Sequence, residues 1–244
     1  MIVHTEGIVL RTLPYQDAHL IVTCYTQAQG KVSFLVRGAR SSRNSSRAAV
    51  LQPLYRLDLV YSTKPGRDLQ TLTEMSLAAV PARLTADPVR CCYGLLLAEV
   101  VNGTQREEEA DTALYAFLNE ALAQLDQAEE GLYPLFLHRL VGYTRFLGFG
   151  PTPLAPLEPI EFSQLDFDSA QGVFSLHPHP ANAYAAWWHQ LLTIPGNQAT
   201  QLKVPKAIRK PLLNSVLHFY QQHVDGFRLP RTLGVFEDMF QETG

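Results

Sequence analysis

The sequence predicts an α+β protein, with a small five-stranded β-barrel over residues 1–80 and an all-helical domain over residues 81–244. Before residue 80, short runs alternate apolar and polar residues, which is the period of a strand buried on one face. After it, apolar residues recur at the three- and four-residue spacing of an amphipathic helix. The charge balance changes at the same point, because residues 1–80 hold nine Lys and Arg against five Asp and Glu, whereas the rest hold eleven against eighteen. Two units with different partners are therefore expected.

Five short strands are expected in residues 1–80. An opening extended run ends at residues 8–10 and meets Pro14. A Gln29-Gly30 turn follows the second strand, and a Lys64-Pro65-Gly66 turn separates the last two. The four later strand candidates are residues 19–25, 31–37, 54–61 and 69–75. Five strands within about 75 residues fit a small barrel such as the OB-fold.

Residues 81–244 are expected to be helical, apart from one insert rich in Pro and Gly. The insert spans residues 151–180, with a short hairpin expected around residues 168–172. Gly148 and the Gly150-Pro151 pair end the helix before it. The expected helices cover residues 89–103, 111–127, 132–149, 181–193, 212–224 and 232–240.

Composition excludes several classes of protein. Hydrophobic residues make up 46% and charged residues 18% of the 244 residues, which is ordinary for a globular protein. No run approaches the roughly 20 apolar residues needed to cross a bilayer, and the first residues lack the basic and apolar regions of a signal peptide. Cys24, Cys91 and Cys92 have no C-x-x-C spacing, which argues against a disulfide framework and a structural zinc site. A cytoplasmic protein is expected.

The most distinctive segment is residues 30–47, with the sequence GKVSFLVRGARSSRNSSR. Between Ala18 and Leu57 there are six basic residues and no acidic residue. Small and hydroxyl-bearing residues separate the arginines, so phosphates can approach the side chains and the backbone N–H groups. The functional interpretation is a binding path for a nucleic-acid backbone, and the alternative is a solvated basic loop. The predicted DNA-binding residues are Lys31, Arg37, Arg40, Arg43, Arg47 and Arg56.

A second basic group lies in the helical domain, in the stretch KVPKAIRK at residues 203–210. A cationic helix start opposes the helix dipole, so phosphate contact is one interpretation and plain solvation is the other. Pro211 is expected to break or open the helix here. Trp187 and Trp188 lie in an expected helix, where stacking on a DNA base is an alternative to packing in the core. The predicted DNA contacts of this group are Lys203, Lys206, Arg209 and Lys210.

Two adjoining segments, EGIVLRTLPYQDAHLIVTCYTQAQG and GKVSFLVRGARSSRNSSRAAVLQPL, resemble the N-terminal domain of the RecO family of recombination mediators. The most specific part is VRGARSSRN followed by LQPL. Further along, RFLGFGP at residues 145–151 resembles the family's helix before its variable insert, and GFRLPRTLGVFEDM at residues 226–239 resembles its closing segment. The resemblance therefore spans nearly the whole chain in the right order.

The resemblance implies a non-enzymatic DNA repair and recombination protein, associated with the nucleoid in the cytoplasm. It implies an OB-fold followed by a helical domain, binding to single- and double-stranded DNA, and annealing of complementary strands. The implied partners are RecR, single-strand-binding protein and, functionally, RecA, which such a protein helps to load onto coated DNA. Arg139 and Arg145, six apart on one expected helix, are candidates to bind the carboxylates of the acidic tail of single-strand-binding protein.

The insert departs from the pattern of many RecO members, which carry a four-cysteine zinc site there. Here residues 151–180 contain no cysteine. His177 and His179 flank Pro178 and cannot supply four tetrahedral ligands. A zinc-less member without a cofactor is therefore expected.

Two other classes of function stay open. An assembly adaptor would use the barrel to bind protein in place of nucleic acid, and an enzyme such as a nuclease is the third candidate. The sequence contains no G-x-x-x-x-G-K-[ST], G-x-S-x-G or H-E-x-x-H motif. The Glu107-Glu108-Glu109 run is typical of a solvated helix start. Salt-dependent binding of oligonucleotides separates the first two classes, and metal-dependent cleavage would reveal the third.

Overall fold

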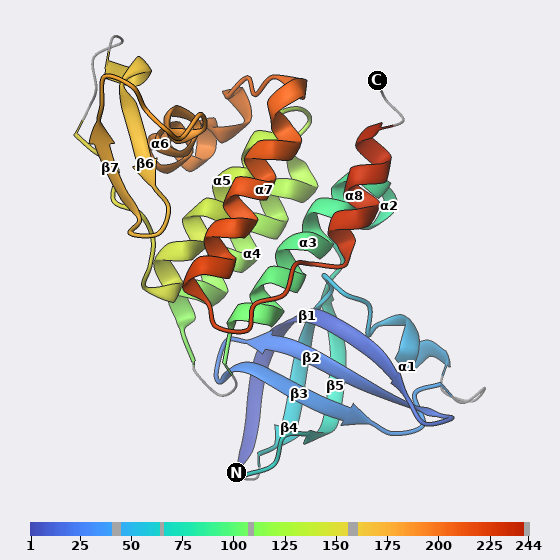
Figure 1. The fold of residues 1–244 in the computed structure, drawn as a ribbon. Coiled ribbons are helices and arrows are strands. Elements are labelled where there is room, and N and C mark those ends of the chain that lie inside the picture. Colours follow the sequence, from blue (N-terminus) through green and yellow to red (C-terminus); the bar gives the residue numbers. More distant parts are fainter. Residues whose placement is uncertain (41–44, 64–65, 107–109, 156–160, 242–244) are drawn as a thin grey trace. The chain divides into compact units, whose positions relative to one another are not determined.

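The structure is a computed structural model, and it describes residues 1–40, 45–63, 66–106, 110–155 and 161–241 (Figure 1). Its contacts divide the chain into two compact units, one of Met1–Gln127 with Pro230–Gly244 and one of Ala128–Leu229. The predicted domain boundary near residue 80 stays a prediction; it marks the point where the strands of the first unit give way to helices. In the described ranges, no helix has the length and apolar character that crossing a membrane requires.

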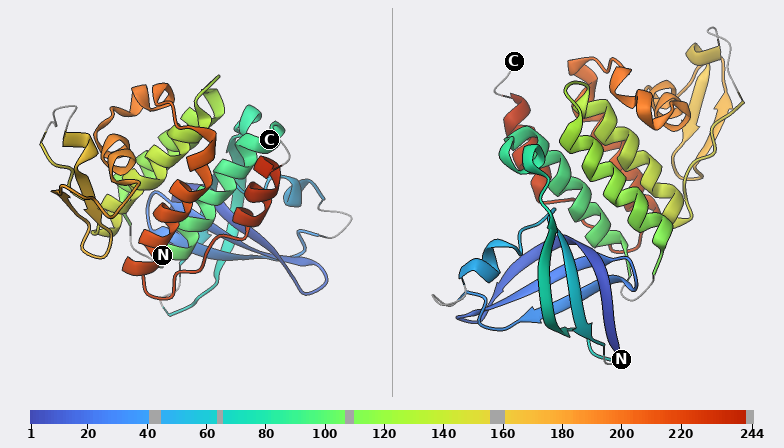
Figure 2. Two further views of the ribbon diagram at one scale, coloured as in Figure 1. Left: turned by 45° about the horizontal axis from the view of Figure 1, so that its top comes forward. Right: turned by 180° about the vertical axis from the view of Figure 1, so that it is seen from behind.

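Five strands of the first unit form a closed barrel in the order β1-β2-β3-β5-β4. Figure 1 shows β1, β2 and β3 in front, and the right view of Figure 2 shows β4 and β5 from behind. Neighbouring strands are antiparallel except β3 and β5, which are parallel. The strands are β1 (Ile2–Tyr15), β2 (His19–Thr26), β3 (Gly30–Val36), β4 (Arg56–Ser62) and β5 (Gln70–Ala79). The predicted OB-type barrel is therefore confirmed.

Strict alternation of side chains fills the barrel. In β3, Val32, Phe34 and Val36 are buried and their neighbours are half-buried, as expected for a strand with one face in the core. The ring of Phe34 lies edge-on to that of Tyr61, with centroids 4.9 Å apart. Tyr61 donates its hydroxyl hydrogen bond to Gln29, 2.7 Å away. The period-two pattern of the sequence therefore identified the buried face of β3.

Strand β1 is longer than the sequence predicted, since it continues through Pro14 to Tyr15. Its pairing with β4 ends at Ile8, whereas its pairing with β2 continues to Tyr15. Pro14 therefore lies where β1 has β2 on one side and no strand of the described chain on the other. A proline, which has no N–H, is tolerated at such an edge.

The pairing of β3 with β5 is short, and the segment that follows β3 is anchored in the barrel core. Only two residue pairs, Phe34 with Gln70 and Leu35 with Thr71, join these strands. Ala39 and Leu51 are fully buried in the barrel core, and Ala48 packs against the same core. Helix α1 (Ser45–Ala49) lies between these anchors. The segment that carries the predicted DNA-binding arginines is thus fixed to the barrel by its own apolar residues.

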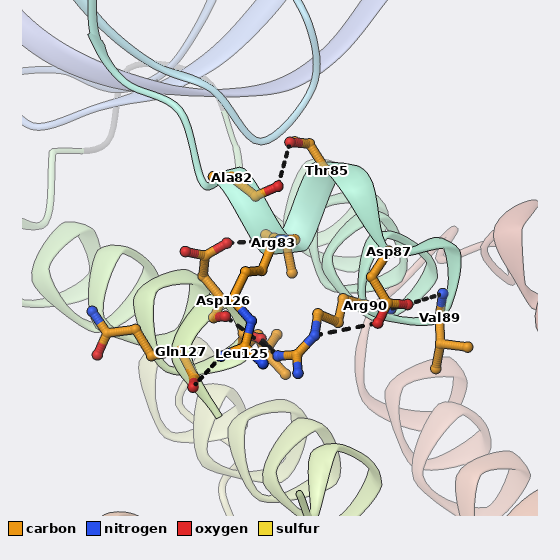
Figure 3. A network of polar contacts seen from close by, with 10 residues as sticks. Ala82, Arg83, Thr85, Asp87, Val89, Arg90, Leu125, Asp126 and Gln127 are labelled. Carbon is orange, nitrogen blue, oxygen red and sulfur yellow. Dashed lines mark hydrogen bonds and ion pairs between the residues drawn. The ribbon is translucent and has the colours of Figure 1, made fainter. Parts of the chain in front are cut away.

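Four further helices complete the first unit, and a polar network joins three of them (Figure 3). They are α2 (Ala82–Ala86), α3 (Pro88–Thr104), α4 (Thr112–Gln127) and α8 (Thr232–Gln241). The buried Arg90 donates to the main-chain oxygens of Leu125 and Asp126 at 2.8 and 3.3 Å, while Arg83 donates to that of Gln127 at 3.1 Å. In return, the Asp126 carboxylate accepts a hydrogen bond from the N–H of Leu84. The side chains of α2 and α3 thus donate to carbonyl oxygens at the C-terminal end of α4, and a carboxylate of α4 accepts from an N–H in the first turn of α2.

The second unit is mostly helical, and it also contains the short hairpin that the sequence predicted in the insert. Strands β6 and β7 pair into a two-stranded sheet, where the sequence predicted a short hairpin. Phe167 of β6 and Phe174 of β7 stack at 4.5 Å, and Phe167 lies 4.9 Å from Trp188. The elements are α5 (Leu132–Tyr143), η2 (Thr144–Leu147), η3 (Glu161–Ser163), β6 (Leu165–Asp168), β7 (Val173–Leu176), α6 (Ala185–Thr193), η4 (Gly196–Gln201) and α7 (Lys206–His223). The sheet persists because its inner faces pack on aromatic rings of the helices.

The helix boundaries in this unit differ from the prediction most at the end of α5 and at the start of α7. Helix α5 ends at Tyr143, and the chain continues as a 3₁₀ turn to the left-handed Gly148. Helix α7 begins at Lys206 and runs through Pro211, which was expected to break or open it. Pro211 removes one backbone hydrogen bond in the second turn. The remaining turns bury Leu212, Leu213 and further apolar residues, so packing outweighs that loss.

Candidate nucleic-acid interface

The arginines that follow β3 lie in a turn that is fixed to the tip of the β1–β2 hairpin. Arg37 and Arg40 are both exposed. Between them, the N–H of Gly38 donates to Nδ1 of His19 at 3.1 Å, and the N–H of Arg40 donates to the main-chain oxygen of Ala18 at 3.0 Å. Gly38 has a φ of 67°, a left-handed conformation that favours glycine. Two cationic side chains are thus presented to solvent from a defined backbone, not from an unattached loop.

The rest of the basic segment continues along the same end of the barrel. Arg47 is half-buried in α1, next to the anchoring Ala48. Figure 1 shows α1 beside the tip of the β1–β2 hairpin, and Figure 2 agrees. Arg43 lies outside the described residues. The structure therefore brings Arg37, Arg40 and Arg47 to one end of the barrel, as a binding path for phosphates requires.

Lys31 and Arg56, two other predicted DNA contacts, are engaged within the protein. Lys31 Nζ donates to the main-chain oxygen of Asn102, 3.1 Å away in the last turn of α3. Arg56 donates to Oδ1 of Asn119 at 2.9 Å and forms an ion pair with Glu6 at 3.4 Å. These contacts join the barrel to α3 and α4. Their assignment to DNA stays a prediction, and the geometry adds no support to it.

The ion pair of Arg56 belongs to a partly buried cluster. The hydroxyl of Tyr115 donates to the same Glu6 carboxylate at 3.1 Å. Burial, followed by the negative charge of Glu6 and this hydrogen bond, raises the pKa of Tyr115 well above its ordinary value. Tyr115 therefore stays a neutral donor, and Glu6 is held between a phenol and a guanidinium. This cluster has a structural role in attaching α4 to the barrel.

Sequence reasoning missed three residues on the outward face of the barrel, namely Arg11, Leu13 and Tyr15 of β1. Arg11 and Tyr15 are exposed on β1, and Tyr15 stands directly opposite His19 of β2. Tyr15 is 39% exposed, which leaves much of its ring available for contact. The alternation of Arg11, Leu13 and Tyr15 carried the signal, but the strand was expected to end before them.

In the second unit, part of the second basic group lines a pocket of about 370 Å³. Its apolar walls come from Pro134, Leu202 and Val204, and Lys203 and Arg209 are its cations. The Arg209 guanidinium lies over the ring of Tyr133, 5.3 Å from the centroid, and its Nε donates to the main-chain oxygen of Val204. Lys206 and Lys210 are exposed at the start of α7. This group combines a cationic surface with an apolar hollow.

The two predicted partner-binding arginines do not share a helix. Arg139 lies in α5 and is only 5% exposed, with its guanidinium near Gly196 of η4. Arg145 lies in the following 3₁₀ turn, exposed, with its guanidinium 4.8 Å from the ring centroid of Phe146. The expectation of one continuous helix through both was wrong, because α5 ends at Tyr143. Binding of a peptide carboxylate by either stays a prediction.

Cys24, Cys91 and Cys92 are thiols that form no disulfide. Among the described residues, no group of three or more His, Cys, Asp or Glu side chains is arranged to hold a metal ion. Burial raises the pKa of Cys24 to about 12, and burial, then Cys91 and Glu99, raise that of Cys92 to about 11. Burial thus disfavours the thiolate form of both side chains, which is the form that zinc binds.

Comparisons with known proteins agree with this architecture. A family model described as "Recombination protein O N terminal" matches residues 1–80, and one described as "Recombination protein O C terminal" matches residues 85–152. The DNA repair protein RecO of Flavobacterium johnsoniae is 30% identical over 251 residues, which cover 98% of this chain and 100% of the relative. That of Christiangramia forsetii is 28% identical over 249 residues, with 98% and 100% covered. That of Salinibacter ruber is 35% identical over 150 residues, with 62% and 57% covered.

Proposed function

Because the chain belongs to the RecO family of DNA repair proteins, we propose that it is a recombination mediator that anneals DNA and helps to load RecA. In this proposal it binds single- and double-stranded DNA and acts on DNA coated with single-strand-binding protein. The observation that carries the proposal is the basic turn at Arg37 and Arg40, exposed and hydrogen-bonded to the tip of the β1–β2 hairpin. No covalent chemistry is part of it.

The proposed mechanism of annealing is electrostatic. Arginines of the segment 37–47 replace condensed counterions on the phosphates of a bound strand. A neutralised strand repels its complement less, so the two strands approach and pair. The chain's net charge of −3 does not oppose this, because the acidic excess lies outside residues 1–80. What matters for the DNA is the local field at the barrel end, which is screened beyond about 10 Å.

For the protein partners, we propose that the second unit binds the acidic, hydrophobic tail of single-strand-binding protein. The pocket beside α7 supports this, because it offers the cations Lys203 and Arg209 together with apolar walls. A carboxylate pairs with a guanidinium, and an apolar side chain fills a hollow that a phosphate would leave empty. Lys206 and Lys210, which are exposed at the start of α7, remain candidates for DNA contact. Binding to RecR and cooperation with RecA complete the proposal as the family suggests.

An oligonucleotide titration at rising salt separates this function from an assembly adaptor. If four to six phosphates are neutralised, log K should fall against log salt with a slope of roughly −3 to −4 for single strands. Annealing of fluorescent complementary oligonucleotides, naked or coated with single-strand-binding protein, then tests the mediator activity. Binding that does not respond to salt would contradict the electrostatic mechanism and favour the adaptor.

A further inference from the structure

The outward face of β1, β2 and β3 carries three rows of side chains, each crossing all three strands. Pairing of β1 with β2 and of β2 with β3 sets the rows. The first row is Tyr15, His19 and Arg37, where Arg37 directly follows the last pair of β3; the second is Leu13, Ile21 and Leu35; the third is Arg11, Thr23 and Ser33. The middle row is aliphatic, and an arginine stands in the row on either side.

One end of this face is covered and the other is open. Ile8 and Tyr25, a cross-strand pair on the same face, are 2% and 0% exposed. By contrast, Leu13, Ile21 and Leu35 are only half-buried, and Arg11 and Tyr15 are exposed. Three partly exposed aliphatic side chains in a row, beside the exposed ring of Tyr15, form an apolar strip on the surface of the barrel.

The charge around this strip is positive. Arg11 stands on one side of the aliphatic row, and Arg37, followed by Arg40, on the other. From Gly7 to Leu57 the only acidic residue in the sequence is Asp17, in the hairpin turn. A ligand with anionic groups at its edges and flat apolar surfaces between them complements this pattern. Single-stranded DNA has that composition, since its phosphates are anionic and its unpaired bases stack on rings and aliphatic side chains.

We propose that unpaired bases of single-stranded DNA lie on the aliphatic row and against Tyr15, and that this contact makes the protein prefer single strands over duplex. The inference rests on the proposed DNA binding and specifies it. A duplex keeps the planes of its bases stacked inside and presents phosphates, sugars and base edges, so it offers this face no base plane on which to stack. Duplex binding therefore depends on the arginines alone, whereas single-strand binding also depends on the strip.

Tyr15→Ala tests the proposal, with three fluorescent ligands of equal length: an oligothymidine, a mixed-sequence duplex and an abasic single strand. Loss of one stacked base weakens binding by about tenfold. We expect the variant to bind the oligothymidine about tenfold more weakly, with unchanged duplex binding and an unchanged salt slope. The parent should prefer the oligothymidine over the abasic strand, and this preference should shrink in the variant. Ile21→Thr, which keeps a β-branched residue in the strand, tests the aliphatic row independently in the same way.

Two controls make the outcome specific. Leu77→Ala removes a side chain that is 43% exposed on β5 of the same barrel, and it should change neither affinity. Tyr15→Phe keeps the ring and should bind as the parent does. The proposal is overturned if the variants lose equal affinity for single strand and duplex, or if neither Tyr15→Ala nor Ile21→Thr loses affinity for the oligothymidine. In that case, salt-dependent binding by the parent would still support the DNA-binding function. Loss of binding to an acidic tail peptide in these variants would overturn it in favour of a peptide site. If the parent binds none of the three ligands, the proposed function itself fails.

Discussion

The ammonium of Lys31 lies 3.1 Å from the main-chain oxygen of Asn102, so β3 donates a hydrogen bond to the last turn of α3. A cation at this end of a helix is also favoured by the helix dipole, by about 0.3–1 kcal/mol. We expect Lys31→Ala to lower the free energy of unfolding by about 0.5–1 kcal/mol with little change in DNA affinity. Urea denaturation and oligonucleotide titration measure the two effects. A loss of affinity without a loss of stability would support the predicted contact of Lys31 with DNA.

Replacing Arg37, Arg40, Arg43 and Arg47 together with Ala should weaken DNA binding and slow annealing, yet leave the fold intact. Surface charges of this kind contribute within about 0.5 kcal/mol each to stability. Each lost phosphate contact should flatten the salt slope by about 0.7 on single strands. Thermal melting, annealing and binding of a tail peptide are measured on the same preparation. Normal melting with unchanged annealing would move the DNA path elsewhere, towards residues 203–210, and loss of tail binding would contradict separate tasks for the two units.

The pocket beside α7 predicts how the second unit responds to charge reversal. Lys203→Glu places a carboxylate at the pocket, and we expect it to weaken binding of a fluorescent acidic tail peptide by about tenfold. Lys210→Glu makes the same charge change on α7 but outside the lining of the pocket, and it should weaken peptide binding much less. Equal losses would mean that only net charge matters, and no loss would remove the pocket from the proposal. Arg145→Ala, measured alongside, tests the alternative site.

The capping network in Figure 3 predicts a difference between two arginines that both donate to the end of α4. Arg90 is 4% exposed and donates to two main-chain oxygens, whereas Arg83 is exposed and donates to one. Arg90→Ala removes the charged donor from these two main-chain oxygens and leaves them without that hydrogen bond. We therefore expect it to lower the free energy of unfolding by about 2–4 kcal/mol. Arg83→Ala should lower it by less than about 1 kcal/mol. Chemical denaturation of the pair measures this, and similar values for both would contradict the importance of burial.

The insert predicts that the purified protein holds no structural zinc. Residues 151–180 contain no cysteine, and Cys24 and Cys92 have raised thiol pKa values. Metal analysis should give well under one zinc per chain, and a chelator should leave the melting temperature unchanged. A stoichiometric content of zinc that resists the chelator would show that other residues supply the ligands.

Much of the barrel could be predicted from the sequence because side-chain alternation is a local property. The pattern identified β2 and β3 to within a residue. It failed at Pro14, since tolerance of a proline in β1 depends on where the pairing with β4 stops, and that is set by residues some 40 positions later. In the same way, Pro211 inside α7 is tolerated because of packing that the sequence does not display.

The candidate site likewise contains residues that the sequence identified and residues that only the structure identified. Exposed arginines in a segment of small residues are visible in the sequence, and Arg37 and Arg40 are exposed. Arg56 belongs to the same basic stretch, but only the pairing of β1 with β4 shows that it meets Glu6. Conversely, Arg11 and Tyr15 became candidates only when the structure showed that they pair across the strands with Thr23 and His19. Cross-strand neighbours are a product of register, and register is what a single strand's pattern does not contain.

The segment between β3 and β4 both packs into the barrel core, through Ala39 and Leu51, and exposes the arginines. Packing and exposure of charge are thus roles of different residues in this segment. Substitutions at the apolar anchors are constrained by the integrity of the barrel, whereas Arg37 and Arg40 can be exchanged with little effect on it. If the arginines bind DNA as proposed, the strength of that binding can be tuned by point changes in this one stretch, without a compensating change in the barrel core.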